Sequence, residues 1–114
     1  MAIPNLDRAT IDPEKLAEYL LNAAHPRGGA KARYFLRYGF APANPEALAV
    51  ALRAQARAAG EVTVETRATG VFYVAIGEID APDGRRPLIR SVWEIRTGET
   101  APRLVTAFRH RRRR

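Results

Sequence analysis

The segment Pro45–Gly60, PEALAVALRAQARAAG, is followed directly by Glu61–Arg67, EVTVETR, and this junction decides the fold class. The first segment is rich in alanine and repeats apolar residues at helical spacing, which predicts a helix that ends at Gly60. In the second segment, Val62 and Val64 alternate with polar residues, which is typical of a strand with one buried face. The chain therefore changes from helical to extended periodicity near its middle.

Two further helices are expected before this junction. Asp12 and Pro13 form an N-cap and first-turn pair, so one helix should begin there and end near residues 22–24. The other helix should cover residues 30–38, with Gly39 as its left-handed cap.

Three more strands are expected after the first one, with glycine-containing turns between them. The apolar and alternating patterns place these strands at residues 71–79, 87–96 and 103–108. Short connections join successive strands as antiparallel hairpins. We therefore expect a single α+β domain over residues 1–108, in which about three N-terminal helices pack on a four-stranded antiparallel meander sheet.

The composition excludes several classes of protein. The chain has 114 residues, which suits one domain, and it contains no cysteine and only two histidines. A disulfide scaffold and a cysteine zinc site are therefore excluded, and no metal or cofactor is expected. The N-terminus does not have the pattern of a signal peptide, and the longest apolar run is far shorter than a membrane span. We expect a cytoplasmic protein without membrane contact, unless the chain is part of a longer exported one.

The positive charge is concentrated at the C-terminus. The formal net charge is +7, and five arginines lie within residues 109–114, so removing these five charges leaves +2 for residues 1–108. Such a run is usually a solvated, disordered arm, and we expect one here. It would add a salt-dependent affinity for nucleic acid that does not depend on sequence.

The joint His25-Pro26-Arg27-Gly28-Gly29-Ala30-Lys31 gathers an imidazole, two cations and two glycines between two expected helices. Histidine exchanges protons near neutral pH, so His25 is a candidate general acid or base. Lys31 and Arg27, together with the free amides at the start of the second helix, would bind a phosphate. The structural alternative is a helix-terminal histidine, a glycine turn and a solvated lysine.

The third expected strand carries a second group of candidates. Alternation places Arg90 and Arg96 on the face opposite Ser91 and Trp93. If the helices cover Trp93, the arginines line an open sheet surface that suits a phosphodiester backbone. The alternative is an ordinary exposed face on which Glu94 offsets part of the charge. The candidate nucleic-acid contacts are Arg27, Ser91 and Arg103.

These residues belong to a longer pattern, which is Leu16-x-x-Tyr19-Leu20-Leu21-Asn22, His25-Pro26-x-Gly28-x-x-Lys31-Ala32, Arg90-Ser91-x-Trp93, Arg96-Thr97-Gly98-Glu99 and Pro102-Arg103-Leu104. The pattern resembles a bacterial domain of unknown function that is found as a small stand-alone protein and at the C-termini of polymorphic toxins. The resemblance spans nearly the whole chain. Ala30 departs from it, because that family often carries a polar residue or a second histidine there, and the arginine tail is not part of it.

The resemblance implies the toxin of a bacterial toxin–antitoxin pair, with a small antitoxin protein and RNA as its partners. The order of helices and then four strands is similar to the barnase, EndoU, colicin and RelE superfamily of metal-independent ribonucleases. In that frame His25 is the general acid or base and Lys31 neutralises phosphate. Arg90, Arg96 or Arg103 would stabilise the transition state. A non-catalytic antitoxin, immunity protein or RNA-binding module remains the alternative, and the nearly neutral charge of the body fits a protein partner at least as well as RNA.

Overall fold

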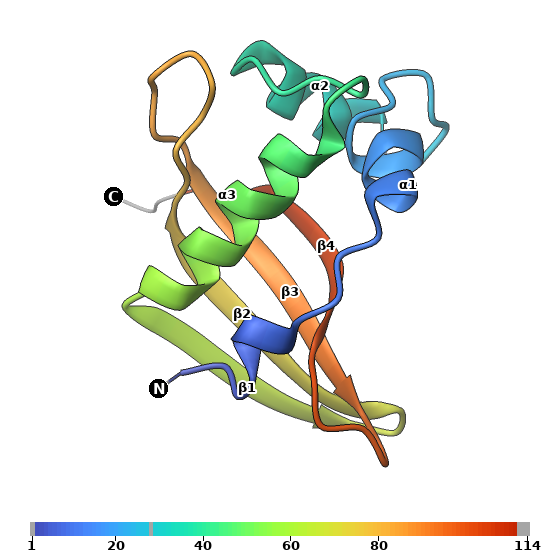
Figure 1. Ribbon diagram of the computed structural model, residues 1–114, viewed down its shortest axis with the longest axis vertical. Coiled ribbons are helices and arrows are strands. Elements are labelled where there is room, and N and C mark those ends of the chain that lie inside the picture. The colour runs from blue at the N-terminus through green and yellow to red at the C-terminus, as the bar shows by residue number, and fades with distance from the viewer. Residues whose placement is uncertain (1, 28, 112–114) are drawn as a thin grey trace.

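Helices occupy the first half of the chain and strands the second, as the change of periodicity at Gly60 predicted (Figure 1). The computed structural model describes residues 2–27 and 29–111. The helical elements are η1 (Leu6–Arg8), α1 (Pro13–Lys15), which continues as the π-helical turn η2 (Leu16–Leu20), α2 (Gly29–Arg37) and α3 (Pro45–Ala58). The strands are β1 (Glu61–Arg67), β2 (Gly70–Glu78), β3 (Leu88–Arg96) and β4 (Arg103–Arg109).

The ends of the helices follow from local hydrogen bonds. The Asp12 carboxylate accepts the N–H of Glu14 at 3.0 Å, so the predicted N-cap is confirmed. The helix that starts there ends at Leu20, slightly earlier than predicted, and the side chain of Asn22 accepts a backbone N–H two residues later. Gly39 has a φ of 99°, which confirms the predicted left-handed cap of α2.

The four strands form one antiparallel meander in the order β1-β2-β3-β4, as predicted. The register of β3 against β4 shifts between Val92 and Trp93, because β4 carries one extra residue, Val105, at that point. Thr10, in the segment before α1, adds a short parallel bridge beside Arg103. The N-terminal segment therefore covers part of the free edge of β4.

The core lies between the helices and one face of the sheet. Phe35 of α2, Leu48 and Leu52 of α3, and Trp93 of β3 are all fully buried. Burying such large side chains contributes roughly 1.5–3 kcal/mol each, before the entropy cost of ordering the chain is counted. The helices therefore cover Trp93, which is the condition under which Arg90 and Arg96 face away from them. We call the opposite side of the sheet, which the helices leave uncovered, the open face (Figure 1).

The last strand extends further than the sequence pattern predicted. Arg109 belongs to β4, and the N–H of His110 donates to the carbonyl of Leu88 over 3.0 Å. The first two residues of the expected tail therefore continue the pairing with β3, while residues 112–114 lie outside the described part of the chain. Within the described ranges, no helix is long and apolar enough to cross a membrane.

Candidate functional site

Backbone contacts hold the joint between η2 and α2 and leave no room for a side chain at Gly29. The N–H of Gly29 donates to the carbonyl of His25 over 2.9 Å. A Cβ atom at Gly29 would lie only 2.6 Å from the carbonyl oxygen of Ala23, closer than real Cβ contacts come. Glycine is therefore required where α2 begins, and the close approach fixes the path of the joint.

His25 is oriented by two neighbours within this joint. Its Nδ1 atom accepts the backbone N–H of Arg27 at 3.1 Å. Its ring lies edge-on to the ring of Tyr19, with 4.8 Å between the centroids. Because Nδ1 accepts a hydrogen bond, the neutral imidazole carries its proton on Nε2. His25 is thus held as an Nε2–H donor.

Lys31 connects the joint to the last strand. Its Nζ atom lies 5.9 Å from the centroid of the Tyr19 ring, against which His25 packs. The same atom donates to Thr106 Oγ1 over 3.4 Å and lies 5.0 Å from the centroid of the Phe108 ring. The ammonium group therefore sits between the joint and two open-face residues of β4.

Arg90 reaches the same ring from the neighbouring strand. Position 90 of β3 pairs with Phe108 of β4, and the guanidinium carbon of Arg90 lies 5.8 Å from the centroid of that ring. Its Nη2 atom donates to His110 Nδ1 over 3.3 Å. We call this group the Phe108 cluster; its members are Tyr19, His25, Lys31, Arg90, Thr106, Phe108 and His110.

A basic hollow of about 450 Å³ lies beside the cluster, between α2 and β4. Among the described residues that line it are four cations and no carboxylate; the cations are Lys31, Arg33, Arg37 and Arg109. Burial, and then a hydrogen bond with Tyr38, raise the pKa of Tyr34 in this hollow to about 12. Tyr34 therefore stays neutral at physiological pH and does not offset the positive charge around it.

Arg96 and Arg103 belong to a separate group. Both approach the buried carboxylate of Glu94, with Nε to Oε1 distances of 3.5 Å for Arg96 and 3.7 Å for Arg103. Thr69 Oγ1 donates to the other carboxylate oxygen over 2.7 Å. Arg96 is six residues along β3 from Arg90, which corresponds to roughly 20 Å in an extended strand. Of the four predicted catalytic residues, Lys31 and Arg90 share the Phe108 ring, His25 is linked to Lys31 through the Tyr19 ring, and Arg96 lies in a different group.

The predicted nucleic-acid contacts also separate. Ser91 is fully buried on the helix-covered face, where its hydroxyl donates to Gln55 Oε1 over 2.7 Å and accepts the indole N–H of Trp93 at 2.9 Å. It does not line a surface, because the alternation of β3 directs it inward. Arg27 is exposed in the joint, and Arg103 is half-buried on the open face beside Glu94.

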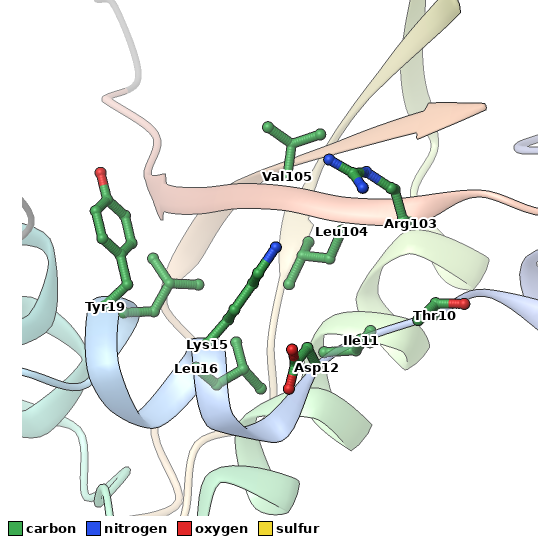
Figure 2. Close-up of a pocket in the computed structure, with 10 residues that line it drawn as sticks. Thr10, Ile11, Asp12, Lys15, Leu16, Tyr19, Arg103, Leu104 and Val105 are labelled. Carbon is green, nitrogen blue, oxygen red and sulfur yellow. The ribbon is translucent and has the colours of Figure 1, made fainter. Parts of the chain in front are cut away.

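An apolar cleft of about 480 Å³ separates the first helix from the free edge of β4 (Figure 2). Leu16 and Leu104 line it from its two sides, and Val105 is 44% exposed beside it. Figure 2 shows the Lys15 ammonium pointing across the cleft toward the strand. Sequence reasoning did not identify this cleft, because it depends on how residues 10–20 dock on β4.

A sheet edge of this kind is often a place where another chain adds a strand. Nowhere in residues 2–27 and 29–111 do three histidine, aspartate or glutamate side chains group to hold an ion. The side chains of the Phe108 cluster supply imidazole, ammonium, guanidinium and hydroxyl groups.

Comparisons with known proteins agree with this fold. The fold is similar to that of a chain in the structure of a contact-dependent growth inhibition toxin–immunity protein complex from Klebsiella pneumoniae 342, with a TM-score of 0.70. The two chains are 21% identical, and the match covers 88% of this chain and 98% of that one. No curated protein matches this sequence. A family model matches residues 2–111, and the chain therefore belongs to the family described as a domain of unknown function, DUF6883.

Proposed function

We propose that this domain is the toxin of a bacterial toxin–antitoxin pair and that it cleaves RNA, without a metal ion, at the Phe108 cluster. The main support is the position of Lys31 and Arg90, whose charges lie 5.0 Å and 5.8 Å from the centroid of one aromatic ring on the open face. A structure of similar fold contains a growth-inhibition toxin and its immunity protein, which fits the same biological setting. Cations and imidazole groups are the groups that phosphodiester cleavage by acid–base chemistry needs.

In the proposed reaction, the 2′-hydroxyl of one nucleotide attacks the adjacent phosphorus. A 2′-O–P bond forms and the P–O5′ bond breaks, which leaves a cyclic phosphate and a 5′-hydroxyl. Lys31 and Arg90 stabilise the negative charge of the phosphorane. In its imidazolium form, which requires the Arg27 N–H to leave Nδ1, His25 donates its Nε2 proton to the leaving 5′-oxygen and becomes neutral. A phosphate that draws Arg90 away from His110 would release His110 Nδ1 to accept the proton of the 2′-hydroxyl.

Controlled expression in a bacterium, without any neighbouring antitoxin gene, tests this proposal. We expect the wild type to arrest growth and degrade RNA, and we expect His25→Ala, Lys31→Ala and Arg90→Ala to lose both effects while remaining folded. Arg57→Ala is the matched control, because Arg57 is exposed near the end of α3, away from the open face. Harmless expression of soluble wild type, with intact RNA, would contradict the proposal.

A second function, a non-catalytic module that binds a protein, is favoured by the cleft beside β4. Apolar walls, an exposed valine and a free strand edge are features of protein-binding surfaces. Co-expression with the product of an adjacent antitoxin-like gene tests this reading. Val105→Asp should reduce co-purification, whereas Val50→Asp, which alters a valine that is 69% exposed on α3, should not. Equal capture of both variants would contradict it.

A further inference from the structure

The open face carries a second aromatic residue that the Phe108 cluster does not use. Ala75, Trp93 and Ala107 are fully buried beneath the helices, so their neighbours in each strand point to the opposite side of the sheet. Phe72 of β2 is one of these open-face residues, and it is partly exposed. It pairs across the strands with Glu65 of β1.

Phe72 is covered by a cation in the same way as Phe108. The guanidinium carbon of Arg67 lies 4.4 Å from the centroid of the Phe72 ring, a distance typical of a cation–π contact. The Arg67 side chain is 53% exposed, and its Nη2 atom forms an ion pair with Glu65 at 2.9 Å. An exposed pair of this kind is weak and is readily exchanged for another anion such as a phosphate.

The register of the sheet gives the separation of the two rings. Phe108 lies opposite Arg90, Arg90 lies opposite Ile76, and Phe72 is four residues from Ile76 along β2. The positions of Phe108 and Phe72 are therefore two strand spacings apart across the sheet and four residues apart along the strands. This corresponds to a separation of roughly 16 Å. An extended nucleic-acid strand covers this span with a few nucleotides.

The surface between the rings suits a polyanion with apolar bases. Val74, Ile76 and Val92 form a partly exposed apolar floor. The cations around this floor are Lys31, Arg67, Arg90, Arg96 and Arg103, and the carboxylates on the same face are those of Glu61, Glu65, Glu78 and Glu94. Glu65, Glu78 and Glu94 each form an ion pair with an arginine, and Glu61 lies opposite Ile76 of the floor. In a duplex the bases are stacked inside and cannot reach such a floor, whereas a single strand presents them.

We infer that Phe72 and Arg67 form a second nucleotide subsite, and that single-stranded RNA crosses the open face from Phe108 to Phe72. One base stacks on the Phe72 ring while Arg67 turns to the adjacent phosphate. This inference rests on the proposed ribonuclease function, because it assigns the substrate class of the same surface. It adds that the domain selects single-stranded segments.

Fluorescence anisotropy with a short fluorescein-labelled 2′-O-methyl RNA tests the inference, because this probe lacks the attacking hydroxyl and is not cleaved. The wild type should bind the single-stranded probe more tightly than a hairpin duplex of the same chemistry. Phe72→Ala should weaken binding of the single strand about ten-fold, the loss expected for one stacked base. Phe72→Tyr, which keeps a ring, should retain the affinity.

Two further variants guard against a folding defect in Phe72→Ala. Arg67→Gln leaves the apolar floor intact and should weaken binding while lowering the slope of its salt dependence by about one. Val50→Ala, on the far side of the molecule from the open face, is the control and should bind like the wild type. Thermal unfolding of each variant shows whether it is folded.

The outcomes separate the inference from the function on which it rests. If the wild type binds neither probe, the ribonuclease proposal itself fails, and a protein partner becomes the better reading of the surface. If the wild type binds RNA, and Phe72→Ala and Arg67→Gln bind it as tightly as the wild type, the second subsite is overturned while the proposed function stands. Equal affinity for the hairpin and the single strand would overturn the selection of single-stranded segments.

Discussion

Polar groups on the two faces of strand β3 differ in how fully they are hydrogen-bonded. On the helix-covered face, Gln55 Nε2 donates to the carbonyls of Ala75 and Ile89 at 3.1 Å each, and its Oε1 accepts the Ser91 hydroxyl. The Ser91 oxygen in turn accepts the indole N–H of Trp93. Each of these groups is satisfied by another group of the core, so the network holds α3 on the sheet.

On the open face, cations lie over aromatic rings and are only partly satisfied. In the described part of the chain, three buried Nε atoms have no hydrogen-bond partner; two of them, those of Arg90 and Arg103, lie on the open face, and the third is that of Arg53 on α3. Lys31 and Arg90 contact the Phe108 ring, which provides a weak interaction and no acceptor oxygen. Under the proposed function, the covered face determines stability, whereas the open face keeps its charges for the RNA. The predictions below test this division.

The largest effect on stability is expected from Gln55→Leu. The change leaves the Ala75 and Ile89 carbonyls and the Ser91 hydroxyl buried without their partner. We expect a loss of about 2–4 kcal/mol in the free energy of unfolding, measured by urea denaturation. Val50→Ala, at an exposed position of the same helix, should change it by less than about 0.5 kcal/mol. A Gln55→Leu variant as stable as the wild type would show that the network does not hold the helix.

A smaller loss in the free energy of unfolding is expected from Gly29→Ala. The new Cβ would meet the Ala23 carbonyl at 2.6 Å, so the joint must shift, at a cost of about 1–3 kcal/mol. The same shift should move His25 away from Tyr19 and lower RNA cleavage. Gly60→Ala is the control, since nothing lies within 4 Å of a Cβ built there. Equal stability of the two variants in urea would contradict the role of the close approach.

A still smaller effect on stability is expected from Arg90→Gln on the open face. The change removes a cation–π contact and the hydrogen bond to His110, but it leaves the core network untouched. The free energy of unfolding should fall by less than about 1 kcal/mol, while RNA cleavage should be lost. Comparison of urea denaturation with cleavage assays on the same preparation checks this. A destabilisation as large as that of Gln55→Leu would break the division between the two faces.

Local sequence signals were sufficient to predict the fold. The Asp12–Pro13 pair, Gly39 and the change of period at Gly60 each act through neighbouring backbone, and the structure confirms them. Asn44 precedes Pro45 just as Asp12 precedes Pro13, but its side chain makes no capping hydrogen bond. A residue type indicates where a helix can begin, whereas the bond itself depends on the conformation of the preceding loop.

The site was predicted only in part, because its geometry depends on long-range features. His25 and Lys31 are close in sequence, and simple alternation placed Arg90 on the open face. Phe108 is an odd number of positions, five, after Arg103. Strict alternation would therefore place the two side chains on opposite faces of the sheet. The extra residue at Val105 reverses the later part of β4 and brings Phe108 to the open face. No signal in the sequence marked this bulge.

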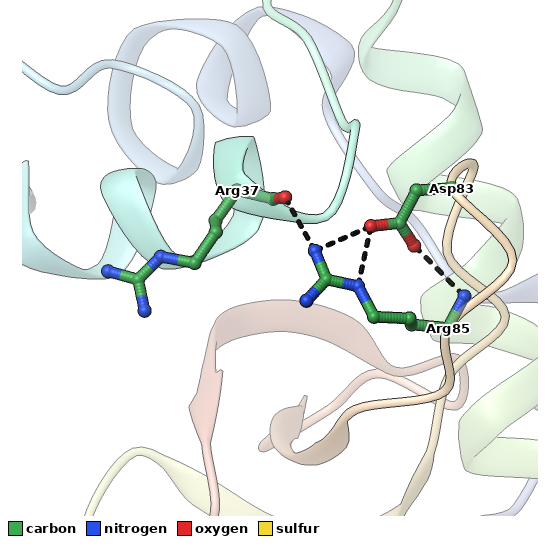
Figure 3. A network of polar contacts seen from close by, with 3 residues as sticks. All are labelled: Arg37, Asp83 and Arg85. Carbon is green, nitrogen blue, oxygen red and sulfur yellow. Dashed lines mark hydrogen bonds and ion pairs between the residues drawn. The ribbon is translucent and has the colours of Figure 1, made fainter.

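The smallest effect is expected outside both faces, where the loop between β2 and β3 meets the end of α2 (Figure 3). Arg85 Nη2 donates to the Arg37 carbonyl over 3.0 Å, and the Arg85 side chain forms an ion pair with Asp83 at 2.7 Å. The side-chain hydrogen bond from Arg85 holds the pKa of Asp83 below its usual value. A lowered pKa in the folded state means that the ion pair stabilises the protein at neutral pH. That stabilisation is lost as the pH falls through the lowered pKa.

Asp83→Asn should therefore lower the melting temperature slightly near neutral pH, and the difference from the wild type should shrink as the solution is acidified. Both groups are accessible to water, so the effect at neutral pH should also decrease in high salt, unlike that of Gln55→Leu. Melting curves of the two proteins across the acidic range, at low and high salt, measure both dependences. The N–H of Arg85 also donates to the Asp83 carboxylate over 2.9 Å, and asparagine can preserve that bond, so the substitution removes the ion pair and leaves the turn. A difference that persists unchanged in acid would therefore contradict the role of the ion pair.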